Sequence, residues 1–415
     1  MNIWLIAEGE PLPIEGQSRL MRVGMLAEYL ARQGHNVTWY SSTFVHGRKE
    51  YLYRKTTEIM VREHERLILL HAPIAYKKNT SFTRVIYMEL LGRAFRQHAH
   101  HEEKPDIVYA SWPLPSFGEE AVRYGRKHNV PVVLDVRDFW PDIFTRAFPQ
   151  GLRWASKLAL QPMQRAARRS FRQADAVTGM VPAALRWGLH KAGRSARALD
   201  QVIYIGYDDS RDLPDEVMRK EIARWGNLGV TPETYNIIFF GSMSAAVIDG
   251  GTCIAGFKKL VQKYPDMRLV LCGDGDGLSR NKALAAGCPQ IVFPGWCDNA
   301  QIQSLLSISN AGLYPMHNLP DFRDTISNKF IGYLAAGLPV ISELEGFSKT
   351  YIERWQIGTT YQENQPDSFA QAAESLYLDR ETAQRLGQNA RKRFEADFDA
   401  EIVNEKFLRL FEELA

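Results

Sequence analysis

The chain has 415 residues, of which 45% are hydrophobic and 24% charged, and its formal net charge is +3. This is the composition of a folded globular protein, and it excludes a disordered chain, a collagen-like repeat and a disulfide scaffold. At about 100–200 residues per domain, the length predicts two domains.

The first half alternates strand-like and helix-like segments. A buried strand is expected at Asn2–Ala7, and a helix from Ser18, its predicted N-cap, to Gln33, because apolar residues there recur on one face. Strands that alternate with helices predict a parallel sheet covered on both faces. Further strands are expected at Asn36–Tyr40, Asp106–Ala110, Val130–Leu134 and Ala174–Met180.

A second alternation begins near Tyr235 and ends in the helical segment Asp379–Leu414. We predict an N-terminal domain at 1–205, a connection at 206–234 that is rich in Asp and Pro, and a C-terminal domain at 235–394. A C-terminal helix at about 395–415 can pack back on the first domain. The second series of strands is expected at Ile237–Phe240, Met267–Cys272, Gln290–Phe293, Ala311–Tyr314 and Leu338–Ile341.

The predicted fold class is therefore α/β, with two Rossmann-like, doubly wound parallel sheets. Ligands of such sheets bind at the carboxyl ends of the strands. Two such edges that face each other would form a cleft for a two-substrate enzyme, with one substrate on each domain.

The N-terminus does not resemble a secretory signal, because no basic stretch precedes the apolar residues and Glu8 and Glu10 interrupt them. No apolar run approaches the roughly 18 residues of a membrane-spanning helix. The cysteines have irregular spacing and no metal-ligand pattern, so reduced thiols and a cytoplasmic chain are expected. They are Cys253, Cys272, Cys288 and Cys297.

Two glycine loops follow strands of the second series. After Phe240, Gly241 and Ser242 would let backbone N–H groups approach an anion, although an ordinary turn has the same pattern. The second loop, Gly273–Gly277, carries two aspartates, so we interpret it as a tight wall loop rather than a phosphate cradle. Neither loop has the spacing of a dinucleotide fingerprint, and the chain has no P-loop.

The segment Asp321–Ile341 is the richest in candidate site residues. Asp324 precedes a helix for which Ser327 and Asn328 are suitable caps. Lys329 lies in the first helical turn, where a cation opposes the helix dipole unless an anion binds there. We therefore consider Lys329 a phosphate ligand, with a solvated surface lysine as the alternative.

The order of these segments resembles the family 4 retaining glycosyltransferases of GT-B fold. The shared features are the FGS loop, the LCGDG strand end, the Pro-Gly-Trp that ends at Trp296, and the helix and strand NKFIGYLAAGLPVI. Gly16 and the helix after it resemble the family's N-terminal loop. The segment Leu134–Asp142 resembles the branch that builds bacterial surface polysaccharides, which includes the N-acetyl-L-fucosamine transferases of O-antigen synthesis.

The resemblance implies a C-terminal domain that binds a nucleotide sugar, with a UDP-linked donor expected, and an N-terminal domain that binds the acceptor. It implies transfer with retention and without an obligatory metal or cofactor. Cations, backbone N–H groups and helix N-termini would stabilise the diphosphate leaving group, and a carboxylate would assist an oxocarbenium-like sugar. The candidate donor-binding residues are Gly16, Arg19, Gly241, Ser242, Gly273, Trp296, Ser327, Asn328 and Lys329. For Arg19, contact with an anionic acceptor is the alternative to contact with a phosphate.

Two positions depart from the family pattern. The family's pair of acidic residues eight positions apart maps to Asp324 and to Gly332, and glycine cannot hold the ribose hydroxyls as the usual glutamate does. After the FGS loop, Asp249 lies near the position where many members carry a lysine for the diphosphate. Either Lys329 and arginines of the other domain supply the charge, or the donor is unusual, or the activity is weak.

In the first domain, Arg137 and Asp138 follow the strand that ends at Asp135, at the edge where a site is expected. We predict a catalytic role for Arg137, Asp138 and Asp324, with a structural Arg–Asp pair as the alternative for the first two. Arg22 is expected on the surface of the first helix. Trp296 either stacks on the base of the nucleotide or only packs.

The net charge conceals an asymmetry, since residues 1–200 carry 30 Lys and Arg against 19 Asp and Glu. Lys77–Arg96 and Leu152–Arg172 read as basic amphipathic helices, which favours an anionic membrane surface and a polyprenyl-diphosphate-linked or glycan acceptor. A core-packing face with solvated charges is the alternative. No nucleic-acid recognition motif is present. His98, His100 and His101 are interpreted as solvated surface residues rather than a metal site.

The sequence thus predicts a bacterial surface-polysaccharide glycosyltransferase, peripheral on the inner face of the plasma membrane. A catalytically weak or inactive GT-B homologue that acts as a binding subunit is the main alternative, because of Gly332 and Asp249. Another GT-B enzyme, such as a sugar epimerase, is a third.

Overall fold

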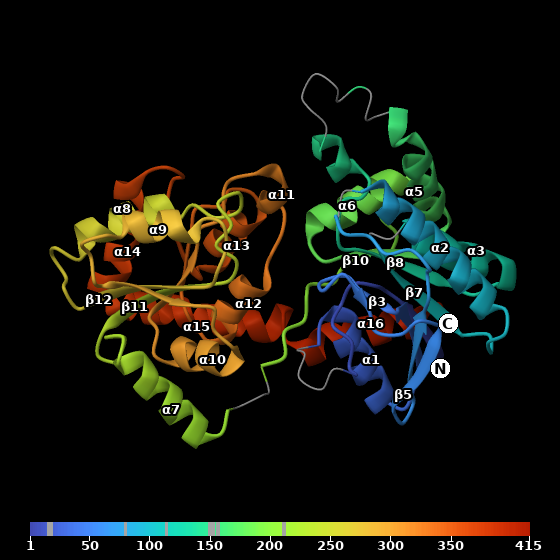
Figure 1. Cartoon of the computed structure of the whole chain (residues 1–415), viewed down its shortest axis with the longest axis horizontal. Coiled ribbons are helices and arrows are strands. Elements are labelled where there is room, and N and C mark those ends of the chain that lie inside the picture. Colours follow the sequence, from blue (N-terminus) through green and yellow to red (C-terminus); the bar gives the residue numbers. More distant parts are fainter. Residues whose placement is uncertain (15–19, 79–80, 113–114, 148–153, 155–157, 210–212) are drawn as a thin grey trace. The chain divides into compact units, whose positions relative to one another are not determined.

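The computed structural model describes residues 1–14, 20–78, 81–112, 115–147, 154, 158–209 and 213–415. The chain forms two compact units (Figure 1). Unit 1 comprises Met1–Gly206 and Ala400–Ala415, and unit 2 comprises Tyr207–Asp399. Among the described helices, none combines the length and the hydropathy needed to cross a bilayer.

Within the described residues, the sheet of unit 1 has eight strands in the order β10-β9-β8-β7-β1-β2-β6-β5, and only β5 runs antiparallel to its neighbour. The strands are β1 (Asn2–Ile6), β2 (Asn36–Ser42), β5 (Thr57–Arg62), β6 (Glu65–Leu70), β7 (Ile107–Trp112), β8 (Val132–Val136), β9 (Ala176–Gly179) and β10 (Gln201–Val202). The short strands β3 (Phe44–Val45) and β4 (Glu50–Tyr51) form a separate hairpin.

Alternate residues of β1 show how helices cover both faces of this sheet. Leu5 belongs to a core cluster that contains Leu26 of α1 and Phe407 of α16. Trp4, one residue earlier, faces the other way and contacts the rings of Phe95 on α2 and Tyr124 on α3. The helices of unit 1 are α1 (Arg22–Arg32), α2 (Phe82–Ala99), α3 (Pro115–His128), a 3-10 helix (Asp142–Ala147), α5 (Gln161–Gln173), α6 (Pro182–Ala192) and α16 (Ala400–Leu414).

Within the described residues, the sheet of unit 2 has six parallel strands in the order β13-β12-β11-β14-β15-β16. They are β11 (Tyr235–Phe240), β12 (Met267–Cys272), β13 (Ile291–Gly295), β14 (Ala311–Tyr314), β15 (Val340–Ser342) and β16 (Gly358–Thr360). Its helices are α7 (Asp215–Gly226), α8 (Gly250–Leu260), α9 (Leu278–Leu284), α10 (Asn299–Ser307), α11 (Pro320–Arg323), α12 (Asn328–Ala335), α13 (Phe347–Trp355), α14 (Pro366–Leu378) and α15 (Arg380–Asp397).

One core of unit 2 lies between its sheet and helices α8 and α14. Ile237 and Phe239 of β11 pack there with Phe257 and Phe369, and all four are fully buried. Phe240, the next residue of β11, faces the opposite side, where its ring contacts Tyr333 of α12. Burial of the sheet on both faces therefore matches the predicted doubly wound fold in each unit.

Two predicted boundaries differ from the structure. The first helix begins at Arg22 with Met21 as N-cap rather than at Ser18, which lies outside the described residues. The Glu10 carboxylate accepts from the Val23 N–H at 2.9 Å and so satisfies an amide of the first turn from a distance in sequence.

Most of 206–234 is part of unit 2 rather than a linker. Its helix α7 packs on α10 through the buried indole of Trp225, which donates to the Ser304 hydroxyl at 3.0 Å. A Trp that is buried in this way anchors the helix to the unit.

Candidate functional site

The two glycine loops at the carboxyl edge of the unit 2 sheet pack directly on each other. Gly273 has φ +139°, and a Cβ added there would lie 1.8 Å from the Gly241 carbonyl oxygen. At Gly275 and Gly277 the added Cβ would meet the backbone of Met243 at under 3.0 Å. Only glycine permits this approach, so Gly273–Gly277 is a wall against the FGS loop.

Hydrogen bonds fix the two loops together. The N–H groups of Gly241 and Met243 donate to the carbonyls of Cys272 and Asp274, at 3.0 and 2.9 Å. Because the N–H of Gly241 already donates to a carbonyl, it is not available to an anion, contrary to the prediction for this loop. Ser242, between them, is exposed at the mouth of the loop.

Lys329 reaches the same loop from the first turn of α12. Its ammonium lies over the Phe239 ring, 4.6 Å from the centroid, and 3.0 Å from where a Cβ on Gly241 would be. Among the described residues it has no ion-pair partner, and burial lowers its pKa to about 8. A half-buried cation without a counter-charge is a strong candidate for an anion ligand.

A cavity of about 390 Å³ opens beside these loops. Trp296, which is 76% exposed, lines it together with the two loops, so its ring is available to a flat ligand. Sequence analysis did not identify four of these lining residues, Cys272, Asp274, Cys297 and Ile302. No motif marks a lone thiol or an isoleucine as a site residue, and Asp274 belongs to the loop that was interpreted as a wall. The described lining residues are Phe240, Gly241, Ser242, Cys272, Gly273, Asp274, Trp296, Cys297 and Ile302.

The remaining candidates of unit 2 lie on the connection into α12. Asp324 is the C-cap of α11 and is half-buried, and it is not among the described residues that line the cavity. Ser327 is the N-cap of α12, but its side chain makes no capping hydrogen bond, contrary to expectation. Asn328 is the first residue of that helix. The structure thus brings Gly241, Ser242, Gly273 and Trp296 together around the cavity, with Lys329 next to Gly241.

The two departures from the family pattern have structural explanations. Asp249 is the buried N-cap of α8 and accepts from both the amide and the hydroxyl of Thr252, so its charge stabilises a helix start. A Cβ at Gly332 would lie 3.3 Å from the Tyr207 hydroxyl and 3.3 Å from the Phe240 ring. Tyr207 and Phe240 therefore border the space that a longer side chain at 332 would enter.

Glu343 is a buried carboxyl that the sequence did not single out. It follows β15, is 1% exposed, and neither of its carboxyl oxygens has a hydrogen-bond partner among the described residues. Burial, with the charges of Asp249 and Glu363, raises its pKa to about 9, so the group is protonated at neutral pH.

In unit 1, Arg22 and Asp135 form a buried ion pair, so the surface position predicted for Arg22 is wrong. The guanidinium donates to both carboxylate oxygens at 2.8 and 2.9 Å. Tyr109 and Thr178 add hydroxyl donors at 2.7 and 2.6 Å, and the Arg22 charge is the largest influence holding the pKa of Asp135 below its usual value despite burial. The pair is buried and links α1 to β8.

Arg137 and Asp138 lie just beyond β8, as predicted, but they do not pair with each other. Arg137 forms an ion pair with Glu10, in the loop that follows β1. The Asp138 carboxylate accepts from the Phe139 amide at 2.8 Å and from the Trp140 indole at 3.1 Å. Their catalytic roles stay predictions, and Gly16 and Arg19 lie outside the described residues.

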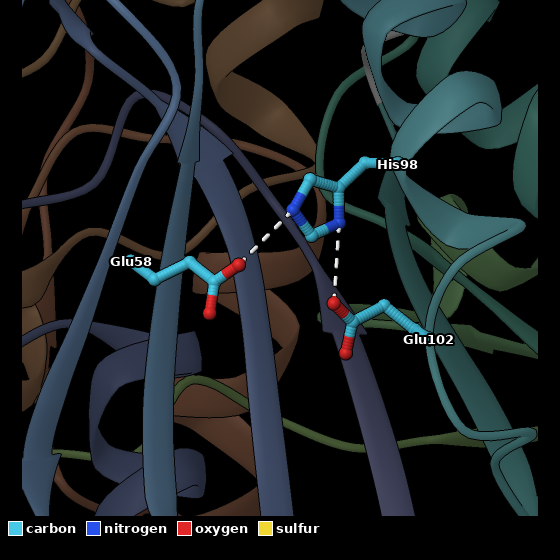
Figure 2. A group of neighbouring side chains, drawn as sticks. All are labelled: Glu58, His98 and Glu102. Atoms are coloured by element: carbon cyan, nitrogen blue, oxygen red, sulfur yellow. Dashed lines mark ion pairs between the residues drawn. The ribbon is translucent and has the colours of Figure 1, made fainter.

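His98 is not a solvated surface residue, because it lies between two carboxylates (Figure 2). Its ring nitrogens are 3.4 Å from Glu58 and 3.5 Å from Glu102. Arg66 pairs with both of these carboxylates as well. The two nitrogens of one ring cannot bind the same ion, and Arg66 already supplies positive charge, so this group is an ion-pair network near the amino end of β6.

The comparisons with known families agree with this geometry. The glycosyl transferase 4-like domain matches residues 21–199, and the glycosyl transferases group 1 family matches residues 251–393. Together they match well over half of the chain. No curated protein sequence matches it significantly.

Solved structures of the same fold cover the whole chain. HepE from Anabaena in complex with UDP has a TM-score of 0.68 at 15% identity, with 100% of both chains covered. Sucrose-phosphate synthase from Thermosynechococcus elongatus has a TM-score of 0.69 at 18% identity, covering 100% of this chain and 98% of its own. WaaG, a glycosyltransferase of lipopolysaccharide biosynthesis, gives 0.64 at 14%, covering 100% and 99%. With both families matched in order and both sheets doubly wound, the chain belongs to the glycosyltransferases of GT-B fold.

Proposed function

We propose that this glycosyltransferase transfers a sugar from a UDP-linked donor to a lipid-linked or oligosaccharide acceptor of a bacterial surface polysaccharide. Structures of HepE with UDP, and with UDP-glucose, support the class of donor, and the lipopolysaccharide role of WaaG supports the class of product. One observation carries the donor assignment: the Lys329 ammonium lies beside Gly241, next to a cavity lined by the exposed Trp296.

In this proposal the donor diphosphate binds between Lys329 and Ser242, and Trp296 stacks on the base. The bond from the anomeric carbon to the diphosphate breaks while the acceptor oxygen bonds to the same face, which retains the configuration. The proton of the acceptor hydroxyl passes to the departing phosphate oxygen, so no metal or separate base is required. The half-buried ammonium stabilises the negative charge that develops on the diphosphate.

The proposed catalytic residues have two different tasks. The Asp324 carboxylate binds hydroxyls of the donor sugar or stabilises its oxocarbenium character. Arg137 and Asp138, at the carboxyl edge of the unit 1 sheet, orient the acceptor. Their partners in the free protein, Glu10 and the Trp140 indole, keep both side chains in defined positions.

A panel of nucleotide sugars, with a short prenyl-diphosphate-linked sugar as acceptor, tests this function. We expect one UDP-sugar to be consumed without added metal, and NMR of the product to show the anomeric configuration of the donor. Lys329→Gln should lower the rate by more than about tenfold, whereas Lys282→Gln, an exposed lysine of the same unit, should not. Loss of activity with a chelator, or an inverted product, would contradict the proposed chemistry.

A non-catalytic binding subunit is the second candidate, and Gly332 favours it. Tyr207 and Phe240 border this position, where the family's ribose-binding glutamate would be. Such a protein would bind UDP without consuming any UDP-sugar. Consumption of a UDP-sugar by the wild type would therefore exclude this candidate, and tighter UDP binding by Gly332→Glu would mean that the ribose of the wild type lacks a partner.

We also propose that the enzyme is peripheral on the inner face of a bacterial plasma membrane. The apolar faces of α2 and α5 are buried within unit 1, so these helices do not lie on a bilayer by those faces as first expected. The support is instead the exposed side chains of Phe82, Trp154 and Leu158, together with exposed basic residues of α5. These are Arg165, Arg168, Arg169 and Arg172.

Co-sedimentation with vesicles tests the membrane proposal. Binding to phosphatidylglycerol vesicles should exceed binding to phosphatidylcholine vesicles several-fold and should fall with salt. Phe82→Ser should reduce it, whereas Leu284→Ser, an exposed leucine of unit 2, should not. Equal binding to both vesicles would contradict an anionic surface as partner.

A further inference from the structure

Two of the four cysteines line the cavity beside the glycine loops of unit 2, which the proposed function assigns to the donor. Cys272 is the last residue of β12, and Cys297 follows the end of β13 by two residues. The other two, Cys253 and Cys288, are buried and are not among the described lining residues. All four are free thiols, so the cavity contains a pair of thiols rather than a lone one.

The pairing of β12 with β13 brings the two thiols to one place. The strands are parallel neighbours, and Cys272 lies opposite Gly295. The Gly295 carbonyl accepts from the Gly273 N–H at 2.7 Å. The Cys297 thiol turns back and donates to the same carbonyl, at 3.7 Å. Its sulfur therefore lies beside the strand end that carries Cys272.

The two thiols also interact directly. A hydrogen bond from the Cys272 thiol is the largest influence on the pKa of Cys297, which is lowered although burial opposes the shift and with support from the charge of Arg224. The same hydrogen bond, followed by burial, raises the pKa of Cys272. Cys297 is therefore the thiol that ionises more readily, and Cys272 keeps its proton.

The two thiols differ in access to solvent. Cys297 is half-buried and follows the exposed Trp296, whereas Cys272 is only 1% exposed. A small oxidant in the cavity therefore reaches the Cys297 sulfur first. Cys272 is placed to react with a neighbouring sulfur, because the two side chains are already in contact. An accessible thiolate beside a second thiol is the arrangement of redox-sensing cysteines.

We propose that peroxide oxidation joins Cys297 and Cys272 in a reversible disulfide, which weakens donor binding in the cavity of unit 2. Cys297 is the thiol that reacts with the peroxide, and Cys272 is the resolving thiol. The effect on donor binding rests on the proposed function, whereas the disulfide itself does not.

The reaction has two steps. The Cys297 thiolate attacks a peroxide oxygen, so that an S–O bond forms and the O–O bond breaks; with hydrogen peroxide, the departing hydroxide takes up the proton that Cys297 released and becomes water. The Cys272 sulfur then attacks the Cys297 sulfenic acid, so that an S–S bond forms and the S–O bond breaks. The second hydroxide leaves as water with the Cys272 proton. The two thiols lose two electrons, which the peroxide gains.

The disulfide changes the wall of the cavity. Its S–S bond is about 2.05 Å long, shorter than any contact between two thiols, so the chain that carries Cys297 moves towards β12. Trp296 is the neighbouring residue, and its exposed ring is the proposed stacking partner of the base. The movement therefore displaces that ring. Conversely, bound UDP should slow the oxidation because it covers Cys297.

Peptide mapping by mass spectrometry tests the disulfide in the full-length protein, after treatment with excess hydrogen peroxide and alkylation of the remaining thiols. Trypsin places Cys272 on 269–280 and Cys297 on 283–323, and a Cys288→Ser background removes the other cysteine of the second peptide. We expect the two peptides to be joined and dithiothreitol to separate them. In Cys272→Ser of this background, Cys297 should instead reach the sulfinic acid. Unlinked peptides, whether unreacted or over-oxidised, would overturn the proposal.

Calorimetric titration with UDP tests the effect on the donor cavity, and each variant is compared with its own reduced form. Oxidation of Cys288→Ser should weaken UDP binding about tenfold, as expected when a base loses an aromatic stacking partner. Dithiothreitol should restore the affinity, which distinguishes a reversible disulfide from damage to the fold. In Cys272→Ser, any loss should persist after dithiothreitol, because thiols do not reduce a sulfinic acid.

Two results separate this inference from the proposed function. Equal UDP affinity of the disulfide-linked and reduced forms would overturn the effect on donor binding. Reduced protein that binds no UDP would contradict the proposed function and with it that effect, while the peptide map still decides whether Cys272 and Cys297 form the disulfide.

Discussion

The carboxyl edges of the two sheets are built by different means. In unit 1, charged side chains hold the edge together, with Arg22 and Asp135 paired in the interior and Arg137 paired with Glu10. In unit 2, backbone packs on backbone through Gly273, and a buried carboxyl, Glu343, lacks hydrogen-bond partners among the described residues. We therefore expect that removing one of these charged side chains destabilises unit 1. In unit 2, we expect that adding atoms to the glycine loops is destabilising.

The largest expected effect is that of Arg22→Met. Removing the guanidinium leaves the Asp135 carboxylate buried and without its cation, which should lower the free energy of unfolding by about 3–5 kcal/mol. Arg32→Met, which breaks the exposed pair with Glu401, should cost under about 1 kcal/mol. Urea unfolding followed by tryptophan fluorescence measures both. A loss in Arg22→Met no greater than in the control would remove the proposed contrast between the units.

Gly273→Ala should be the most damaging single-methyl change in unit 2. The new Cβ would overlap the Gly241 carbonyl at a strained φ, and we expect a loss of about 2–4 kcal/mol. Gly287→Ala provides the matched control, since φ there is +78° but nothing lies within 4 Å. That variant should lose only about 1 kcal/mol. If the two variants have equal stability, the close approach of the loops is not limiting.

Glu343→Gln should stabilise unit 2, and the gain should grow with pH. Because the folded-state pKa is raised, the wild type has no penalty below the unfolded pKa and becomes less stable as pH rises from about 4.5 towards 9. We expect a gain on the order of 1–3 kcal/mol near neutral pH and almost none near pH 4.5. Unfolding at several pH values measures it, with the exposed Glu345→Gln as control. A gain that is independent of pH would contradict the assignment.

The pattern of apolar runs was enough to predict the fold class and most central strands. Met267–Cys272 is a strand over its whole predicted length, because it is an almost continuous apolar run that ends at a glycine loop. The hairpin of Thr57–Arg62 and Glu65–Leu70 was missed, since charged residues such as Glu58, Arg62 and Glu65 interrupt its apolar pattern.

The candidate site was predictable where its residues directly follow strands of one sheet. Gly241, Gly273 and Trp296 each follow a strand of the same sheet, so topology brings them to one edge. The Arg22–Asp135 pair joins residues 113 positions apart, and a helical pattern alone cannot reveal such a partner. The buried position of Glu343 also depends on tertiary packing, and no local motif predicts it.

The affinity for UDP as a function of pH tests the central claim most directly. If the Lys329 ammonium binds the diphosphate, affinity should fall as pH rises through about 8, where the lysine loses its proton. Lys329→Gln should bind about tenfold more weakly at neutral pH, a difference of about 1.4 kcal/mol, and Lys329→Arg should abolish the fall. Calorimetric dissociation constants that are equal for wild type and Lys329→Gln across this range would contradict the account.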